Sequence, residues 1–242
     1  MSNGKAPFEY EIILTADGSP TLSLWGGEKM HSLDGALSES LYIYGPAIGA
    51  AIENGGSNIL SMGLGIGYNE IISHCHFHQK QMTEFHILSF EKVPELRTFF
   101  KEWIMDLSTP LNECFDNILK QITDQFSIDH NILKQELKTS LNEKRLLILE
   151  SLESKNPSQK KYQGILYDAF SSNTDDYLWD ENHIENFVDQ YCDPHKCWFS
   201  TYAATGGLKR ALKNKGFLLE KKAGFGKKRE STFATRSRRA SE

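Results

Sequence analysis

Three alternating glycines constrain the fold of this chain more than any other feature. An apolar run at residues 58–62 leads directly to Gly63, Gly65 and Gly67, after which apolar residues recur with helical spacing. This order is typical of a strand, a tight turn and the N-terminus of a helix. Such a turn lets a ligand contact bare backbone, and the helix end offers free N–H groups. A plain tight turn without a ligand is the alternative.

The glycine spacing favours one kind of ligand. A dinucleotide-binding turn has its third glycine three positions after the second, where this chain has Tyr68. The alternating spacing suits a nucleoside without a pyrophosphate, as in S-adenosylmethionine-dependent methyltransferases. A second apolar run, residues 84–90, ends at Glu91, whose carboxylate in a doubly wound sheet would reach ribose hydroxyls. A role for Glu91 as a helix cap or a solvated loop residue is the alternative.

Composition places the chain among ordinary globular proteins. Its 242 residues, 39% hydrophobic and 24% charged, suffice for one large α/β domain with a sizeable core. No apolar run approaches the roughly 20 residues needed to span a bilayer, and residues 1–7 lack the apolar core of a secretory signal. The four cysteines have no paired metal spacing and indicate reduced thiols. We therefore expect a cytoplasmic protein without a metal or a membrane partner.

The charge is distributed unevenly along the chain. The net charge is −5, but residues 207–242 contain twelve Lys or Arg and three Glu, a local net of +9 that leaves −14 on the rest. A basic end on an acidic body suggests a polyanionic partner that docks at one face. A solvated tail is the alternative, and we expect one at residues 236–242. That alternative fits less well for Lys227, Lys228 and Arg229, which precede a strand-like run.

Strand and helix patterns alternate, which predicts an α/β fold with a doubly wound, mostly parallel, Rossmann-like sheet and an antiparallel last strand. Strands are expected at 10–14, 20–25, 58–62, 84–90, 164–167, 198–202, 217–220 and 232–235. Helices are expected at 67–74, from 94 onward, at 180–191 and at 207–214, and residues 106–155 are mostly helical in pattern. We expect an N-terminal extension at 1–53 with short strands and a substrate-side segment, a methyltransferase domain at 54–235 and a disordered basic tail at 236–242.

Several polar segments should meet at one edge of this sheet. The glycine turn, Glu91, Asp168 and residues 202–206 each follow a predicted strand. In a doubly wound sheet the ligand lies outside the carboxyl ends of the strands. The sequence therefore predicts a single site at that edge.

Further motifs lie along residues 10–235. They are Gly63-x-Gly65-x-Gly67-x-Asn69, Ser-Phe-Glu-Lys-x-Pro at 89–94, Asp-Ala-Phe at 168–170 followed by Trp179, a Ser/Thr-rich turn at 200–206 followed by Leu212, and Gly-Phe-Gly-Lys-Lys-Arg-Glu at 224–230. Together with residues 31–40, this set resembles the methyltransferase domain of the bacterial tRNA 5-methylaminomethyl-2-thiouridine biosynthesis protein family (MnmC), including its stand-alone forms. The closing motif at 224–230 is the most specific part.

This resemblance implies methyl transfer from S-adenosylmethionine to the aminomethyl nitrogen of a wobble uridine in tRNA. The residues implied in cofactor binding are Gly63, Gly65, Gly67, Asn69 and Glu91. The residues implied in substrate binding are His31, Tyr202, Lys227, Lys228 and Arg229, of which the last three would hold tRNA phosphate. Because the flavin oxidase half of bifunctional relatives is not found in this sequence, a separate flavin oxidase acting upstream is a possible partner.

Asp168 is the catalytic candidate, because a carboxylate beside the amine can orient it and accept its proton. For three of these residues, a purely structural role stays open. Asp168 can be a turn or capping aspartate, Tyr202 a strand residue packed on the core, and His31 a solvent-exposed turn residue.

The chain departs from the family pattern at two places. In the family, a proline usually stands shortly after Asp-x-Phe, whereas this chain has Ser171-Ser172-Asn173 there. In the family, a Gly-Asp pair usually places an acid near the adenine. Residues 106–155 contain no such pair, and Glu143 and Glu150 are the candidates to replace its acid. A methyltransferase-fold enzyme with another amine acceptor, such as an aminopropyltransferase, and a catalytically silent RNA-binding module therefore remain alternatives. An NAD-linked oxidoreductase fits worst because of Tyr68.

Overall fold

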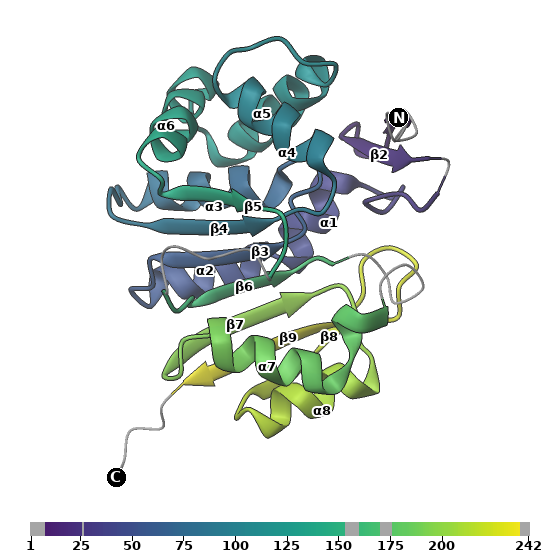
Figure 1. Cartoon of the computed structure of the whole chain (residues 1–242), viewed down its shortest axis with the longest axis vertical. Coiled ribbons are helices and arrows are strands. Elements are labelled where there is room, and N and C mark those ends of the chain that lie inside the picture. Colours follow the sequence, from purple (N-terminus) through teal and green to yellow (C-terminus); the bar gives the residue numbers. More distant parts are fainter. Residues whose placement is uncertain (1–7, 26, 153–159, 170–175, 238–242) are drawn as a thin grey trace, which may run out of the picture.

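A seven-stranded sheet forms the centre of the molecule, in a computed structural model that describes residues 8–25, 27–152, 160–169 and 176–237 (Figure 1). The strand order is β5-β4-β3-β6-β7-β9-β8. The strands are β3 (Asn58–Met62), β4 (His86–Phe90), β5 (Leu146–Leu149), β6 (Gly164–Tyr167), β7 (Lys196–Thr201), β8 (Leu218–Ala223) and β9 (Glu230–Ser237). The first five pair in parallel, whereas β9 is antiparallel to both β7 and β8. The predicted mostly parallel sheet with an antiparallel last strand is confirmed.

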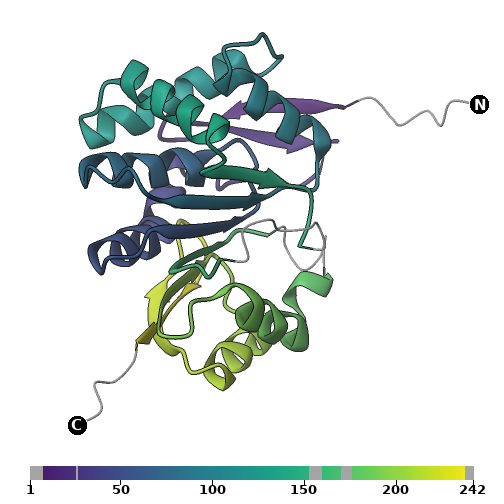
Figure 2. The same cartoon turned by 60° about the vertical axis from the view of Figure 1, so that its left-hand side comes forward.

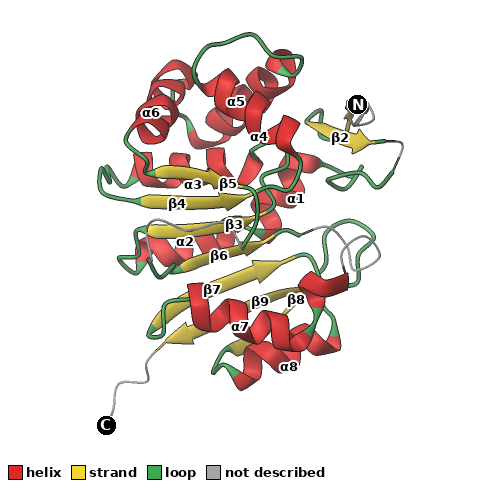
Figure 3. Cartoon of the chain, in the orientation of Figure 1, coloured by secondary structure: helices red, strands yellow, loops and turns green. Residues whose placement is uncertain are grey.

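Helices cover both faces of the sheet (Figures 2 and 3). One face packs against α1 (Ala36–Ile43), α2 (Gly45–Glu53), α3 (Tyr68–Gln79), α4 (Pro94–Ile104), α5 (Asn112–Phe126) and α6 (His130–Asn142). The other packs against α7 (Glu181–Tyr191), α8 (Gly206–Asn214) and the short 3₁₀ helix at Asp176–Trp179. Successive strand residues serve opposite faces, as Ile59 and Leu60 show by belonging to different core clusters. Apolar strands of this kind are expected when both faces are buried.

A separate hairpin of β1 (Tyr10–Leu14) and β2 (Pro20–Leu24) precedes the sheet. The turn between its strands reaches α1, where the Asp17 carboxylate accepts a hydrogen bond from the Ser38 N–H at 2.9 Å. The Tyr68 hydroxyl at the start of α3 donates to the Pro20 carbonyl at 2.8 Å. The hairpin and the segment after it are therefore fastened to the helices that begin at the carboxyl edge of the sheet. The division of the chain at residue 53 stays a prediction.

One segment differs from the expected elements, and another had no element assigned to it. Residues 146–149, within the region expected to be mostly helical, form the edge strand β5 beside β4. Periodicity cannot separate a four-residue apolar run from part of a buried helix, and only pairing with β4 decides it. The apolar stretch at 41–52 forms parts of two helices, and Pro46 lies in the first turn of the second, where its missing N–H is tolerated.

The C-terminal strand runs further than expected. β9 extends through Ser237, two residues into the predicted tail, and the Arg236 guanidinium donates to the Asp193 carbonyl at 2.7 Å. Residues 238–242, the rest of that tail, lie outside the described residues. In the part of the chain that the structure covers, no helix is long and apolar enough to cross a membrane.

Candidate active site

The glycine turn joins β3 to α3. A Cβ on Gly63 would lie 2.3 Å from the Asp168 carbonyl oxygen, and one on Gly67 would lie 2.2 Å from the Phe100 ring. Both glycines also have positive φ, 101° and 85°. The turn thus needs glycine at these positions so that the segment directly after β6 and helix α4 can approach it. Gly65 also has a positive φ, 53°, but a Cβ there would have only the Met30 sulfur nearby, at 3.5 Å.

Glu91 follows β4 and is tied to the glycine turn. Its Oε2 accepts the Gly65 N–H at 2.9 Å, and its Oε1 accepts the Val93 N–H at 2.8 Å. Burial raises the pKa of Glu91, while these hydrogen bonds act in the opposite direction. An ionised carboxylate has about four lone-pair sites, so Glu91 retains capacity to accept hydrogen bonds from a ligand's hydroxyls.

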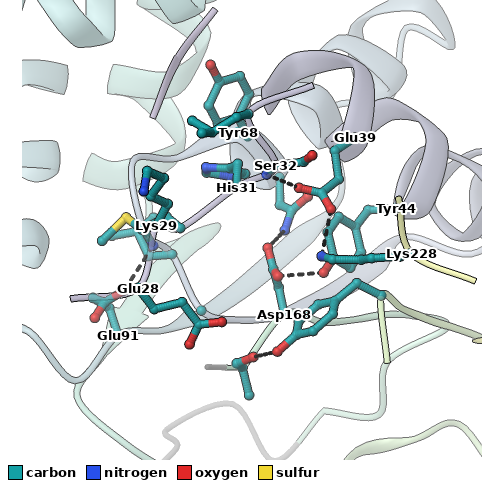
Figure 4. A pocket seen from close by; sticks show the side chains of 18 of the residues that line it. Glu28, Lys29, His31, Ser32, Glu39, Tyr44, Tyr68, Glu91, Asp168 and Lys228 are labelled. Atoms are coloured by element: carbon teal, nitrogen blue, oxygen red, sulfur yellow. Dashed lines mark hydrogen bonds and ion pairs between the residues drawn. The ribbon is translucent and has the colours of Figure 1, made fainter. Parts of the chain in front are cut away.

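Asp168 follows β6 and lies at the centre of the site (Figure 4). The Tyr44 hydroxyl donates to its Oδ1 at 2.5 Å, and the Asn69 amide donates to its Oδ2 at 3.3 Å. Burial raises the pKa of Asp168 to about 7, against the opposing effect of the Tyr44 hydrogen bond. A carboxyl group with a strongly shifted pKa in a cavity is characteristic of functional sites.

Asn69 links Asp168 to the start of α3. Its amide nitrogen is used by Asp168, but its Oδ1 is buried without a hydrogen-bond partner among the described residues. Buried polar atoms are usually satisfied, so an orphaned acceptor beside a cavity indicates a place for a ligand's donor. An ammonium or amino group of a ligand would satisfy it.

The closing motif, residues 224–230, separates its three basic side chains. Lys228 forms an ion pair with Glu39, with Nζ and Oε1 2.9 Å apart, and its Nζ lies 4.3 Å from the centre of the Tyr202 ring. All three basic side chains are exposed, and Lys227 and Arg229 have no ion-pair partner among the described residues. The motif therefore reaches the site through one lysine only.

Tyr202 and His31 complete the walls. Tyr202 follows β7, donates its hydroxyl to the Ala169 carbonyl at 2.8 Å, and has a pKa raised by burial. The His31 ring lies 3.1 Å from the Thr21 hydroxyl through Nδ1 and packs edge-on against Tyr68. Burial lowers the pKa of His31 to about 4, so its imidazole is neutral at pH 7.

These side chains enclose a cavity of about 420 Å³, within the range of small-molecule sites. Eight of the predicted residues line it: His31, Gly63, Gly65, Asn69, Glu91, Asp168, Tyr202 and Lys228. Gly67, Lys227 and Arg229 are not among its lining residues. The roles assigned to all of them from the sequence stay predictions.

Sequence reasoning missed two lining residues of consequence. Tyr44 belongs to an apolar stretch that indicates core, and nothing in its sequence context marks a hydroxyl aimed at Asp168. Glu39 lies within residues 31–40, which resemble the family segment, so a signal for it existed. Both come from α1 and the start of α2, helices that precede the glycine turn.

The adenine side of the predicted site is more open. Glu150 directly follows β5, at the same edge as Glu91, and its side chain is 69% exposed with Oε2 3.7 Å from the Arg97 guanidinium. Glu143 lies before β5 and therefore at the opposite edge of the sheet, where it pairs with Arg145. Glu150 is thus the better-placed of the two candidate acids. Phe170 and Ser171-Ser172-Asn173 lie outside the described residues.

The sequence predicts no metal site. Within the described ranges, no group of three or more His, Cys, Asp or Glu side chains is arranged to hold a metal ion.

The family of S-adenosyl-L-methionine-dependent methyltransferases accounts for this arrangement. Its model matches residues 109–237, more than half of the chain, so the protein belongs to this family. Membership and fold together imply the use of S-adenosylmethionine. The matched range includes Asp168, Tyr202 and the closing motif, and it begins after the glycine turn.

Individual relatives show which members of this family the chain is similar to. The bifunctional tRNA 5-methylaminomethyl-2-thiouridine biosynthesis proteins MnmC of Idiomarina loihiensis and Marinomonas sp. (strain MWYL1) are 26% and 24% identical over 71% and 76% of this chain. These matches cover only 28% and 27% of those proteins. The uncharacterized protein MJ0670 of Methanocaldococcus jannaschii is 25% identical over 93% of this chain and 59% of its own length.

A solved structure agrees with the fold. The crystal structure of MNMC2 from Aquifex aeolicus superposes with a TM-score of 0.66 at 24% identity, covering 95% of this chain and 71% of that one. The resemblance drawn from the motifs is thereby confirmed: the chain is a methyltransferase that is similar to MnmC proteins.

Proposed function

We propose that this protein transfers a methyl group from S-adenosylmethionine to the aminomethyl nitrogen of 5-aminomethyl-(2-thio)uridine at the wobble position of tRNA. The observation that carries the proposal is Asp168, a carboxyl group with a pKa near 7 in the same cavity as the glycine turn. The likeness to MnmC proteins supports the choice of acceptor.

The residues at the carboxyl edge fit S-adenosylmethionine. Gly65 offers a backbone surface that no side chain covers closely, Glu91 offers carboxylate oxygens for ribose hydroxyls, and the free Asn69 Oδ1 suits the amino group. Gly63 and Gly67 shape the turn that holds these groups together. Glu150 is available on the adenine side. The bound cofactor supplies an electrophilic methyl group on its sulfonium centre.

Asp168 prepares the acceptor. An amine attacks only through its free electron pair, so its proton must leave before or during the transfer. A carboxylate whose pKa lies near the working pH is an effective proton acceptor, and the Tyr44 and Asn69 hydrogen bonds fix its orientation. Alignment of amine and methyl group supplies much of the remaining acceleration.

Binding of tRNA would use the outside of the closing motif. Lys227 and Arg229 are exposed, carry charge and suit phosphate contacts, which fix position without reading sequence. The wobble base would leave its stack to enter the cavity, where His31 and Tyr202 can contact it. We further propose that the reaction takes place in the cytoplasm and that a flavin oxidase acting upstream supplies the free aminomethyl group. In this scheme residues 1–53 act as the substrate-side extension.

One experiment tests the proposal. The purified protein is incubated with S-adenosylmethionine and tRNA bearing 5-aminomethyluridine, and the nucleosides are analysed by mass spectrometry. We expect a mass gain of one methyl group on the target nucleoside and cofactor binding in calorimetry. Binding of S-adenosylmethionine without methylation would point to another amine acceptor, for which polyamines are the first to try. Absence of both would leave a silent RNA-binding module.

A further inference from the structure

All three cations of the closing motif are exposed, but one of them, Lys228, with 43% of its side chain exposed, also lines the cavity. Lys228 lines the cavity with Asp168, whereas Lys227 and Arg229 do not (Figure 4). The expectation that all three hold phosphate treats them as equivalent, and the structure shows that their surroundings differ.

Glu39 holds the Lys228 ammonium in place. The Glu39 carboxylate is buried, with 4% of the residue exposed, and its Oε2 accepts the Ser32 N–H at 2.6 Å while its Oε1 pairs with Lys228. A buried carboxylate fixed at both oxygens cannot easily release its counter-ion. The loop itself is seated tightly, because a Cβ on Gly226 would lie 2.1 Å from the Asp34 carboxylate.

The Lys228 ammonium retains a donor for a ligand. An ammonium has three N–H donors. One of them is used by Glu39, and the ammonium also lies over the face of the Tyr202 ring. The charge of Lys228 also acts on Asp168: burial raises the pKa of that carboxyl group, and Lys228 works in the opposite direction. A group bound at Asp168 therefore lies within the influence of Lys228.

The chemistry of the substrate indicates what this donor meets. In a 5-aminomethyluracil the amine is attached through one carbon to ring position 5, and the 4-carbonyl oxygen is on the adjacent ring atom. A base whose amine lies at Asp168 brings that acceptor close to the same wall. A pyrimidine with an amino group at position 4 presents a donor there instead.

We propose that Lys228 recognises the base: held by Glu39, its ammonium donates a hydrogen bond to the 4-carbonyl oxygen of the target uracil. Glu39 is then a positioning residue, and phosphate contacts fall to Lys227 and Arg229. This inference rests on the proposed function, since it names how that site selects its substrate.

Matched substrates test the hydrogen bond. Anticodon stem-loop RNAs carry either 5-aminomethyluridine or 5-aminomethylcytidine at the wobble position, and kcat/KM is measured for each. We expect the wild type to prefer uridine. Lys228→Met should lower kcat/KM for the uridine RNA by roughly 10- to 100-fold and bring the ratio between the two RNAs close to one. An equal loss on both RNAs would overturn the proposal.

Conservative and positioning variants keep this test decisive. Lys228→Arg retains a charged donor and should retain the preference for uridine. Glu39→Gln keeps the ammonium but removes its counter-ion, so the preference should shrink without reaching that of Lys228→Met. Thermal melting and calorimetric titration with S-adenosylmethionine establish that each variant is folded. If Lys228→Met fails to fold, loss of the preference in Lys228→Arg or its full retention in Glu39→Gln counts against the proposal.

Salt dependence separates a base contact from a phosphate contact. Binding of the uridine RNA is measured at several salt concentrations. Lys227→Ala should reduce the slope of log K against log salt by about one, as loss of a phosphate contact does. Lys228→Met should leave the slope as it is, like the control Lys80→Met at the C-terminal end of α3, on the opposite edge of the sheet. A slope reduced in Lys228→Met would make Lys228 a phosphate ligand and end the proposal.

The two levels of inference fail differently. A wild type that methylates neither RNA refutes the proposed function itself. A wild type that methylates the uridine RNA, together with a Lys228→Met variant of unchanged preference, refutes only the role of Lys228.

Discussion

The two sides of the cavity are built in different ways. On the side proposed to bind the cofactor, Gly65 and Glu91 are joined by a hydrogen bond between residues 26 apart in sequence, because they follow the neighbouring parallel strands β3 and β4. On the substrate side, the Tyr44–Asp168 and Glu39–Lys228 contacts span 124 and 189 residues. The side with Gly65 and Glu91 is formed by consecutive strand–turn–helix units. The side with Asp168 and Lys228 forms only when segments distant in sequence have folded together.

This difference has a consequence for function. In the proposed function, backbone groups and a short turn provide the cofactor site, which many sequences can share because it depends on glycine and one acid. Side chains from α1, α2 and the closing motif would provide the acceptor site, which depends on this chain's own packing. Variants on the substrate side should therefore change turnover and selectivity, and variants on the cofactor side should change folding and cofactor binding.

The largest expected effect lies at Asp168. Asp168→Ala removes the proposed proton acceptor, and we expect turnover to fall by roughly 10²- to 10⁴-fold. The affinity for S-adenosylmethionine should change far less, because the glycine turn and Glu91 remain in place. Single-turnover methylation and calorimetry measure the two quantities. Equal losses in both would show that Asp168 belongs to the cofactor side.

Gly63 tests the other half of the comparison. Gly63→Ala places a Cβ against the Asp168 carbonyl oxygen in a backbone conformation with φ of 101°. We expect the free energy of unfolding, measured in urea, to fall by roughly 1–3 kcal/mol. Gly65→Ala is the matched control: its φ of 53° is also in the left-handed region that favours glycine, but its Cβ meets nothing closer than 3.5 Å, so it should cost less stability than Gly63→Ala. It should lower cofactor affinity more than stability, and the reverse order would contradict the assignment of the two glycines.

Tyr44 sharpens the boundary between the two sides. Its hydroxyl stabilises the ionised form of Asp168, so Tyr44→Phe should raise the pKa of that carboxyl group above its value of about 7. Because the ionised form is the active one, the acid limb of kcat/KM against pH should move to higher pH by about one unit. Activity should recover at alkaline pH.

Tyr42→Phe is the control for this shift, because the Tyr42 hydroxyl donates to the Ala223 carbonyl and not to the site. A loss of activity in Tyr44→Phe that is the same at every pH would assign Tyr44 a packing role only.

The sequence predicted the cofactor side better than the substrate side. The glycine turn, the end of β4 and the end of β6 follow from local apolar runs and their terminators, so the shared edge could be inferred from residues 58–67, Glu91 and Asp168. The Tyr44 hydroxyl and the Lys228–Glu39 pair could not, because neither periodicity nor spacing reveals which segments meet across a cavity. Strand β5 was missed for a related reason, since its pairing partner identifies it and its composition does not.

The smallest expected effect concerns Glu70, a second carboxyl group near the site that is not among the lining residues of the cavity. Glu70 is fully buried in α3; its Oε1 accepts the Ser89 hydroxyl at 2.7 Å, and its Oε2 has no partner among the described residues. Burial raises its pKa to about 7. Since the pKa in the folded protein exceeds that of an unfolded glutamate, the folded state binds the extra proton, and stability falls as the pH rises from about 4.5 to about 7.

Glu70→Gln removes this loss, so the variant should be more stable than the wild type at pH 8, on the order of 1 kcal/mol, and no more stable at pH 4. Urea unfolding at both pH values measures the difference. Asp168→Asn should show the same sign, because the pKa of Asp168 is raised in the same way, but only Asp168→Asn should abolish the acid limb of the pH–activity profile. A stability gain in Glu70→Gln that does not depend on pH would mean that packing at this position, and not the buried charge, determines it.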